Sequence, residues 1–227
     1  MKKMKLGEFT KEQVLSFAKK IYSEGVADFE IRKEKCALLV IDMQDEFVKP
    51  HWCPFWIPGA TDQVSRINKL IQFCRKNDIP IIWTVMAKTH FYRDRPKSGK
   101  FMPNGYEFLD MDMSHLFVEG NIYKNLDVKP EYDVILKKCS YGAFYDTPLE
   151  TILKSYERDT IIITGTLTNY CCGTTAREGY ARGFNVIFGS DLTATDDPAM
   201  QEPEEKTLRK GFARIMKLSE ILNVLEN

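Results

Sequence analysis

The chain has 227 residues, of which 44% are hydrophobic, and this length fits one large domain with a substantial core. Its 32 basic and 32 acidic residues give a formal net charge of zero, which excludes both the basic surplus typical of nucleic-acid binders and the acidic surplus typical of disordered chains. Because the basic residues at 1–6 precede no apolar signal-peptide core and no apolar run approaches the ~18 residues of a membrane span, we expect a cytoplasmic protein with neither nucleic-acid nor membrane partners.

The first predicted element is a helix. Thr10-Lys11-Glu12-Gln13 has the form of a capping box, and Gly25 is suited to end the helix. Between them, apolar residues recur at helical spacing at Val14, Phe17, Ala18 and Ile21. We predict an N-terminal helical arm over 1–30, which either packs on the main domain or takes part in an oligomer contact, followed by one domain over 31–227.

Apolar runs and helical patterns alternate through that domain. Strands are predicted at 36–41, 79–85, 132–138, 160–164, 184–188 and 212–216, and helices at 61–76, 147–156, 169–182, 204–210 and 219–225. In the helix at 147–156, Thr147 is the expected N-cap, with Pro148 as the first helical residue. The alternation predicts a three-layer α-β-α fold with a mostly parallel sheet, and the irregular segment 88–129 is typical of a lid or binding loop.

Reactive side chains follow three of these strands. Asp42 follows the first strand, Lys138 ends the third, and Cys171 lies at the helix start after the fourth. Ligands of such sheets bind at the carboxyl ends of the strands. A helix N-terminus and an ammonium group both stabilise a thiolate, and a carboxylate can accept the thiol proton. Taken singly, each residue also has an ordinary structural interpretation, as a helix cap, a solvated charge or a small buried side chain.

Three motifs carry a family resemblance. Leu38–Gln44 is a strand that ends in Asp-x-Gln, Lys138–Phe144 is similar to a Lys-x-x-x-Ser-Ala-Phe block with Gly142 in place of the serine, and Gly165–Cys171 is similar to a nucleophile turn. From about Cys36 to its C-terminus, the chain resembles the isochorismatase-like cysteine hydrolase superfamily, which includes nicotinamidases, N-carbamoylsarcosine amidases, ureidoacrylate hydrolases and biuret hydrolases.

The resemblance implies a triad of Asp42, Lys138 and Cys171 and a cis peptide bond between Thr166 and Leu167. It also implies a six-stranded parallel sheet in the order 3-2-1-4-5-6 and assembly into homodimers or homotetramers. The backbone N–H groups of Leu167 and Cys171 are the candidate oxyanion donors. Cys172 lies where the family has Val, and one residue along a helix turns a side chain by about 100°, so Cys172 is expected in the core.

The residues beyond the second predicted strand bear on metal binding. Nicotinamidases resemble one another in a metal site built on Asp-x-His, and the matching stretch here, Met86 to Phe91, has no such motif. We therefore expect no metal and no other cofactor. The six cysteines are expected to be reduced thiols, because no CxxC motif and no secretory signal is present.

Retention of Cys171 with Lys138 favours a hydrolase of carbon–nitrogen bonds other than peptide bonds. It would cleave a small amide or ureido (carbamoyl) substrate through a thioester and release ammonia. Alternatives are a nicotinamidase or isochorismatase activity, a non-catalytic relative that binds a small molecule, and a thiol redox protein that uses Cys171 with Cys172.

The expected substrate contacts come from three stretches of the chain. A substrate carboxylate would be bound by basic residues at 93–97. Each aromatic residue in the set has plain packing as its alternative. The complete set is Gln44, Phe47, Trp56, His90, Arg93, Tyr141, Phe144, Thr168 and Tyr170.

Overall fold

The structure, a computed structural model, describes residues 5–89, 110–112 and 114–226. A six-stranded sheet in the order β3-β2-β1-β4-β5-β6 forms its centre, and every pairing between neighbouring strands is parallel, which confirms the predicted fold. The strands are β1 (Cys36–Ile41), β2 (Ile81–Met86), β3 (Val134–Lys138), β4 (Thr160–Thr166), β5 (Asn185–Ala194) and β6 (Arg214–Met216).

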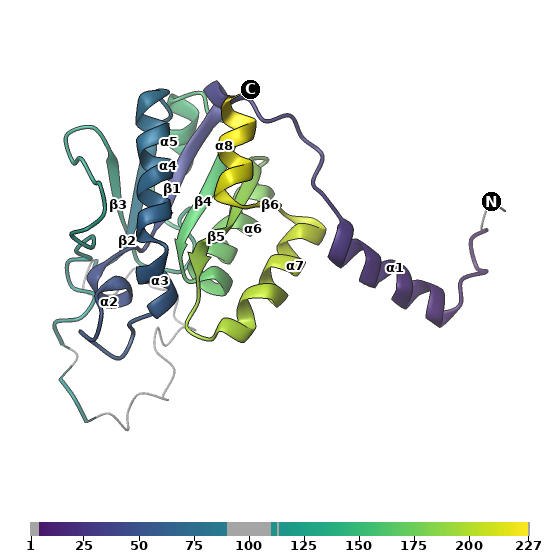
Figure 1. Cartoon of the computed structure of the whole chain (residues 1–227), viewed down its shortest axis with the longest axis horizontal. Helices are drawn as coiled ribbons and strands as arrows, with labels where there is room; N and C mark the ends of the chain where they lie inside the picture. The colour runs from purple at the N-terminus through teal and green to yellow at the C-terminus, as the bar shows by residue number, and fades with distance from the viewer. Residues whose placement is uncertain (1–4, 90–109, 113, 227) are drawn as a thin grey trace.

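Helices cover both faces of this sheet (Figure 1). One face carries α3 (Pro58–Asp62), α4 (Val64–Lys76) and α8 (Leu218–Glu226), with the short α2 (Asp45–Val48) at its edge, and the other carries α5 (Leu149–Ser155), α6 (Gly173–Ala181) and α7 (Gln201–Gly211). All six residues of β1 are buried. Leu38 and Val40 pack into the core beneath α4, whereas Leu39 and Ile41 pack into the core beneath α6, because successive strand side chains alternate between faces.

Several element boundaries differ from the sequence-based expectation. The predicted helix at 61–76 is two helices that meet at Gln63. The fifth strand continues to Ala194, since its second half still pairs with β4. The sequence did not predict this part of the strand, because it has no continuous apolar run. The N-cap of α5 is Pro148 rather than Thr147, although the Thr147 hydroxyl still accepts a hydrogen bond from the Leu149 N–H at 3.2 Å.

The N-terminal helix α1 (Lys11–Glu24) projects from the body of the molecule (Figure 1). Both hydrogen bonds of the predicted capping box are present between Thr10 and Gln13. No side chain of α1 is buried, and the contact of this helix with the body includes the Lys210 ammonium, which lies 4.1 Å from the ring centroid of Tyr22. Among the described helices, including the 3-10 turns Lys33–Lys35 and Pro198–Met200, none is long and apolar enough to span a membrane.

Candidate active site

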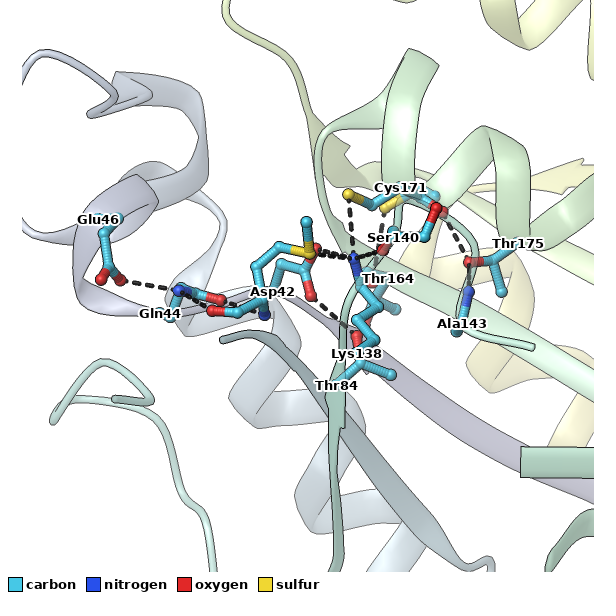
Figure 2. A network of polar contacts seen from close by, with 12 residues as sticks. Asp42, Gln44, Glu46, Thr84, Lys138, Ser140, Ala143, Thr164, Cys171 and Thr175 are labelled. Carbon is cyan, nitrogen blue, oxygen red and sulfur yellow. Dashed lines mark hydrogen bonds and ion pairs between the residues drawn. The ribbon is translucent and has the colours of Figure 1, made fainter. Parts of the chain in front are cut away.

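The three reactive residues lie together at the carboxyl ends of the strands (Figure 2). Asp42 directly follows β1, Lys138 is the last residue of β3, and Cys171 lies in a π-helical turn, Thr168–Cys172, between β4 and α6. The Lys138 Nζ lies 2.7 Å from Asp42 Oδ2 and 3.3 Å from Cys171 Sγ. The lysine therefore reaches past the end of β2 and bridges the carboxylate and the thiol.

Backbone and hydroxyl groups hold this arrangement in place. The Lys138 ammonium also donates to the Ser140 carbonyl at 2.9 Å and contacts Met86 Sδ at 3.2 Å, so its position is fixed on several sides. The Thr84 hydroxyl donates to Asp42 Oδ1 at 3.0 Å. Asp42 Oδ2 is buried, and its partner among the described residues is the Lys138 ammonium.

Burial decides the charge states of the site. The side chains of Asp42 and Lys138 are 0% exposed, and Cys171 is 2% exposed. The pKa of the Cys171 thiol is raised to about 12, because burial and the charge of Asp42 raise it by more than the Lys138 ammonium lowers it. Burial also lowers the pKa of Lys138, but the charge of Asp42 and the hydrogen bonds to both partners outweigh this effect and raise that pKa above its ordinary value.

The resting site is therefore a carboxylate, an ammonium and a neutral thiol, with no net charge. Loss of the thiol proton to solvent would leave a net negative charge in a buried position, which is unfavourable. Transfer of the same proton to Asp42 keeps the net charge of the three groups at zero. The geometry thus favours a thiolate that forms only by proton transfer to the carboxylate.

The nucleophile turn begins at Gly165, whose φ of 112° is in the left-handed region. A Cβ atom at this position would lie 2.0 Å from the Ile41 carbonyl oxygen, so only glycine allows β4 to approach β1 here. The Thr166–Leu167 peptide bond is cis, as the resemblance implied. The N–H groups of Leu167 and Cys171 follow this bond, and their role as oxyanion donors remains a prediction.

Thr175 connects the nucleophile to the loop after β3. Its hydroxyl donates to the Cys171 carbonyl at 2.7 Å and accepts a hydrogen bond from the Ala143 N–H at 3.0 Å (Figure 2). Cys172 points elsewhere: it is 0% exposed, packs in the core beneath α6, and its pKa is raised by burial. All six cysteines are free, so no disulfide links Cys171 to Cys172.

Three of the expected substrate contacts are buried, and their contact with substrate stays a prediction. The Gln44 amide is fully buried, donates to Glu46 and to the Met86 carbonyl, and accepts the Met86 N–H at 2.7 Å. Phe47 and Phe144 are buried in the two cores, on opposite faces of the sheet. Their sequence positions beside the motifs gave no indication of which way the rings point.

The other expected contacts are placed as follows. The half-buried Trp56 donates its indole N–H to the Thr61 hydroxyl at 2.9 Å, and the buried Thr168 donates to Gln201 at 2.6 Å. The Tyr141 and Tyr170 rings lie 5.3 Å apart, and Tyr170, the neighbour of Cys171 in the chain, is 44% exposed. His90 and Arg93, with the other basic residues of 93–97, lie outside the described residues.

The sequence analysis missed several residues that shape the site. Thr84 pairs in register with Ile41, next to Asp42. It is the polar residue in the otherwise apolar β2, and this could have indicated a hydrogen-bonding role in the site. At Gly142, a Cβ atom would lie 2.2 Å from the Glu178 carboxylate, whose oxygen accepts the Phe144 N–H at 3.0 Å. The glycine therefore makes room for a carboxylate on α6. Among the described residues, no cluster of His, Cys, Asp and Glu is arranged to hold a metal ion.

Comparisons with known proteins agree with this geometry. The family model described as the isochorismatase domain matches residues 36–220. The chain is 29% identical over 201 residues to nicotinamidase 3 of Arabidopsis thaliana, covering 86% of this chain and 93% of that protein. It is 39% identical over 191 residues to the ureidoacrylate amidohydrolase RutB of Methylorubrum extorquens, covering 77% of this chain and 76% of that one.

A solved structure extends the likeness to three dimensions. The crystal structure of a cysteine hydrolase from Pseudomonas syringae pv. phaseolicola 1448A superimposes with a TM-score of 0.76 at 26% identity, covering 90% of this chain and 98% of that one. The chain therefore belongs to the isochorismatase family.

Proposed function

We propose that the protein hydrolyses a carbon–nitrogen bond of a small amide or ureido (carbamoyl) compound through a thioester at Cys171 and releases ammonia. The observation that carries this proposal is the buried Lys138 ammonium, within 2.7 Å of Asp42 and 3.3 Å of the Cys171 sulfur. These are the groups that acyl transfer to a thiol needs: a nucleophile, a base and a fixed cation.

The reaction would begin with attack on the carbonyl carbon. Asp42 takes the thiol proton while the Cys171 sulfur bonds to the carbon, and the carbonyl oxygen becomes an oxyanion near the N–H groups of Leu167 and Cys171. The carbon–nitrogen bond then breaks, and the leaving nitrogen takes the proton back from Asp42. The amine leaves and a thioester remains on Cys171.

Water completes the cycle. Asp42, again a carboxylate, takes a proton from a water molecule that attacks the thioester carbon. The carbon–sulfur bond breaks, the acid product leaves, and the Cys171 thiolate takes the proton from Asp42. In both halves Lys138 keeps its proton, consistent with its raised pKa, and offsets the negative charge that moves between carboxylate and sulfur.

The amide or ureido class is supported by two considerations. Cys171 is 2% exposed, which favours a small substrate whose acyl carbon can reach the buried sulfur. Two of the relatives, the ureidoacrylate amidohydrolase and nicotinamidase 3, are named for a ureido acid and for nicotinamide. A nicotinamidase activity is the second candidate, favoured by the 29% identity to nicotinamidase 3 over most of both chains.

A panel of primary amides and N-carbamoyl compounds, with nicotinamide and ureidoacrylate among them, tests the proposal by ammonia release. Wild type and Cys172→Ala are expected to release ammonia from the same compound, and Cys171→Ala is expected to release none. Mass spectrometry of the quenched reaction should show the acyl group on the peptide that contains Cys171. Full activity of Cys171→Ala would contradict the mechanism, and tight binding without turnover across the panel would indicate a non-catalytic relative.

A further inference from the structure

We propose that Gln63 is a positioning residue that fixes the turn after β1, which carries the base, relative to the turn after β4, which carries the oxyanion donor. This inference rests on the proposed function. Gln63 lies between α3 and α4, outside all three sequence motifs, and its side chain is 1% exposed. A buried glutamine is unusual, because glutamine side chains are mostly exposed in folded proteins. The other side chains that α4 buries are apolar or cysteine.

One NH₂ group of Gln63 reaches both turns. Its Nε2 lies 3.0 Å from the Gly165 carbonyl oxygen and 3.4 Å from Met43 Sδ. Met43 is the residue after Asp42, and the Gly165 carbonyl lies one residue before the Thr166–Leu167 peptide bond. A single planar group therefore links the side chain of the residue after the base to the backbone next to the predicted oxyanion donor.

The Gly165 carbonyl needs a side-chain partner at this point. The pairing of β4 with β5 shifts its register between Ile163 and Gly165, so the regular ladder is interrupted there. The close approach to Ile41 leaves no room for a side chain on residue 165 itself. A donor from the helical layer is then the available way to hold this carbonyl, and Gln63 supplies it.

The orientation of the amide has a consequence for the role of Gln63. Its nitrogen must face Gly165, because the amide oxygen there would oppose another acceptor. The Gln63 Oε1 is then buried without a hydrogen-bond partner among the described residues, as is the neighbouring Thr166 hydroxyl oxygen. A lone buried acceptor is unfavourable for folding. An amide that bonds at one end only is a poor choice for stability but serves well to hold two turns in register.

The contrast with Gln44 sharpens this interpretation. Both amides are buried, but Gln44 is bonded at its nitrogen and its oxygen, to Glu46 and to both backbone groups of Met86. Replacement of Gln44 by Met strips three groups of their partner, whereas Gln63→Met strips one, the Gly165 carbonyl, and also removes an unpaired buried oxygen. We expect a clearly larger fall in melting temperature for Gln44→Met than for Gln63→Met.

The test combines stability with steady-state kinetics on the substrate found by the panel. For Gln63→Met we expect a melting temperature within about 4 °C of wild type. We expect kcat to fall about 10- to 100-fold, as for a misplaced catalytic geometry, with KM changed by less than about threefold. Gln63→Glu should recover activity as the pH falls, because a protonated carboxyl can donate to the Gly165 carbonyl and a carboxylate cannot.

A second probe works without any substrate. [1-¹³C]Acetaldehyde adds reversibly to a reactive thiol. We expect the oxygen of the adduct to occupy the predicted oxyanion position, so the affinity measured by NMR titration reports on that position. Weaker binding by Gln63→Met than by wild type supports the inference even if the amide panel shows no turnover. Wild-type kcat and acetaldehyde affinity in a folded Gln63→Met would overturn it, as would a loss of activity in Gln63→Met that only follows a large loss of melting temperature.

Discussion

The strongest quantitative prediction concerns the change of Lys138 to Met, which keeps the length of the side chain and removes its charge. With 2.7 Å between Nζ and Asp42 Oδ2, the attraction is about 6 kcal/mol at an effective dielectric constant of about 20. Desolvation of the two buried groups offsets most of that attraction in the wild type. The variant, however, leaves the Asp42 carboxylate buried without a cation, although the Thr84 hydroxyl still donates to it. We therefore expect Lys138→Met to lower the free energy of unfolding by about 3–5 kcal/mol.

The sign of the pH dependence follows from the same contact. In Lys138→Met the folded state holds a proton on Asp42 more tightly than the unfolded chain does, because protonation removes the unpaired charge. The extra loss of stability is therefore absent only below the unfolded-state pKa of about 3.9, where the carboxyl is protonated in both states, and it grows as the pH rises above that value. We expect the difference from wild type to be several times larger at pH 8 than at pH 4.5.

Urea unfolding followed by tryptophan fluorescence measures this difference at each pH. The double variant Asp42→Asn/Lys138→Met is the matched control, because it has lost both charges and should recover to within about 1 kcal/mol of wild type. A loss below about 1 kcal/mol for Lys138→Met at pH 8, or a double variant no more stable than the single one, would refute the assignment of a buried ion pair.

Three further predictions follow from the structure. The pKa of Cys171 is about 12 in the folded chain and about 8.5 in the unfolded chain, so the free energy of unfolding should fall as the pH rises above about 9. Between pH 7 and pH 10, Cys171→Ala should lose about 2 kcal/mol less of this free energy than wild type, and equal losses would contradict the raised pKa. Gly142→Ser should displace the Glu178 carboxylate and break the hydrogen bond that it accepts from the Phe144 N–H, at a cost of about 1 kcal/mol in urea unfolding. The same change should cost less in a Glu178→Ala background, and an equal cost in both backgrounds would contradict this contact. We propose that the exposed apolar face of α1 binds a second copy of the chain. Deletion of residues 1–24 should then lower the mass of the assembly in sedimentation by more than the mass of the deleted residues and shift the melting temperature by less than about 4 °C. An unchanged number of subunits would exclude this role.

The sequence alone determined the elements and the order of the reactive groups. The continuous apolar run at 36–41 predicted a strand buried on both faces, and all six of its residues are buried. The capping residues predicted α1, and the motif positions predicted that Asp42, Lys138 and Cys171 follow three strand ends. Such features are local, because they depend on propensity and spacing within a few residues.

Only the tertiary structure decided which side chains meet. Phe47 and Phe144 stand beside motif residues in the chain but point into the cores, because the direction of a side chain depends on the packing around it. Gln63 is far in sequence from both turns that it contacts, and no periodicity marks such a contact. The neutral state of the Cys171 thiol likewise depends on burial and on two charges brought in from other strands, which no local pattern in the sequence can specify.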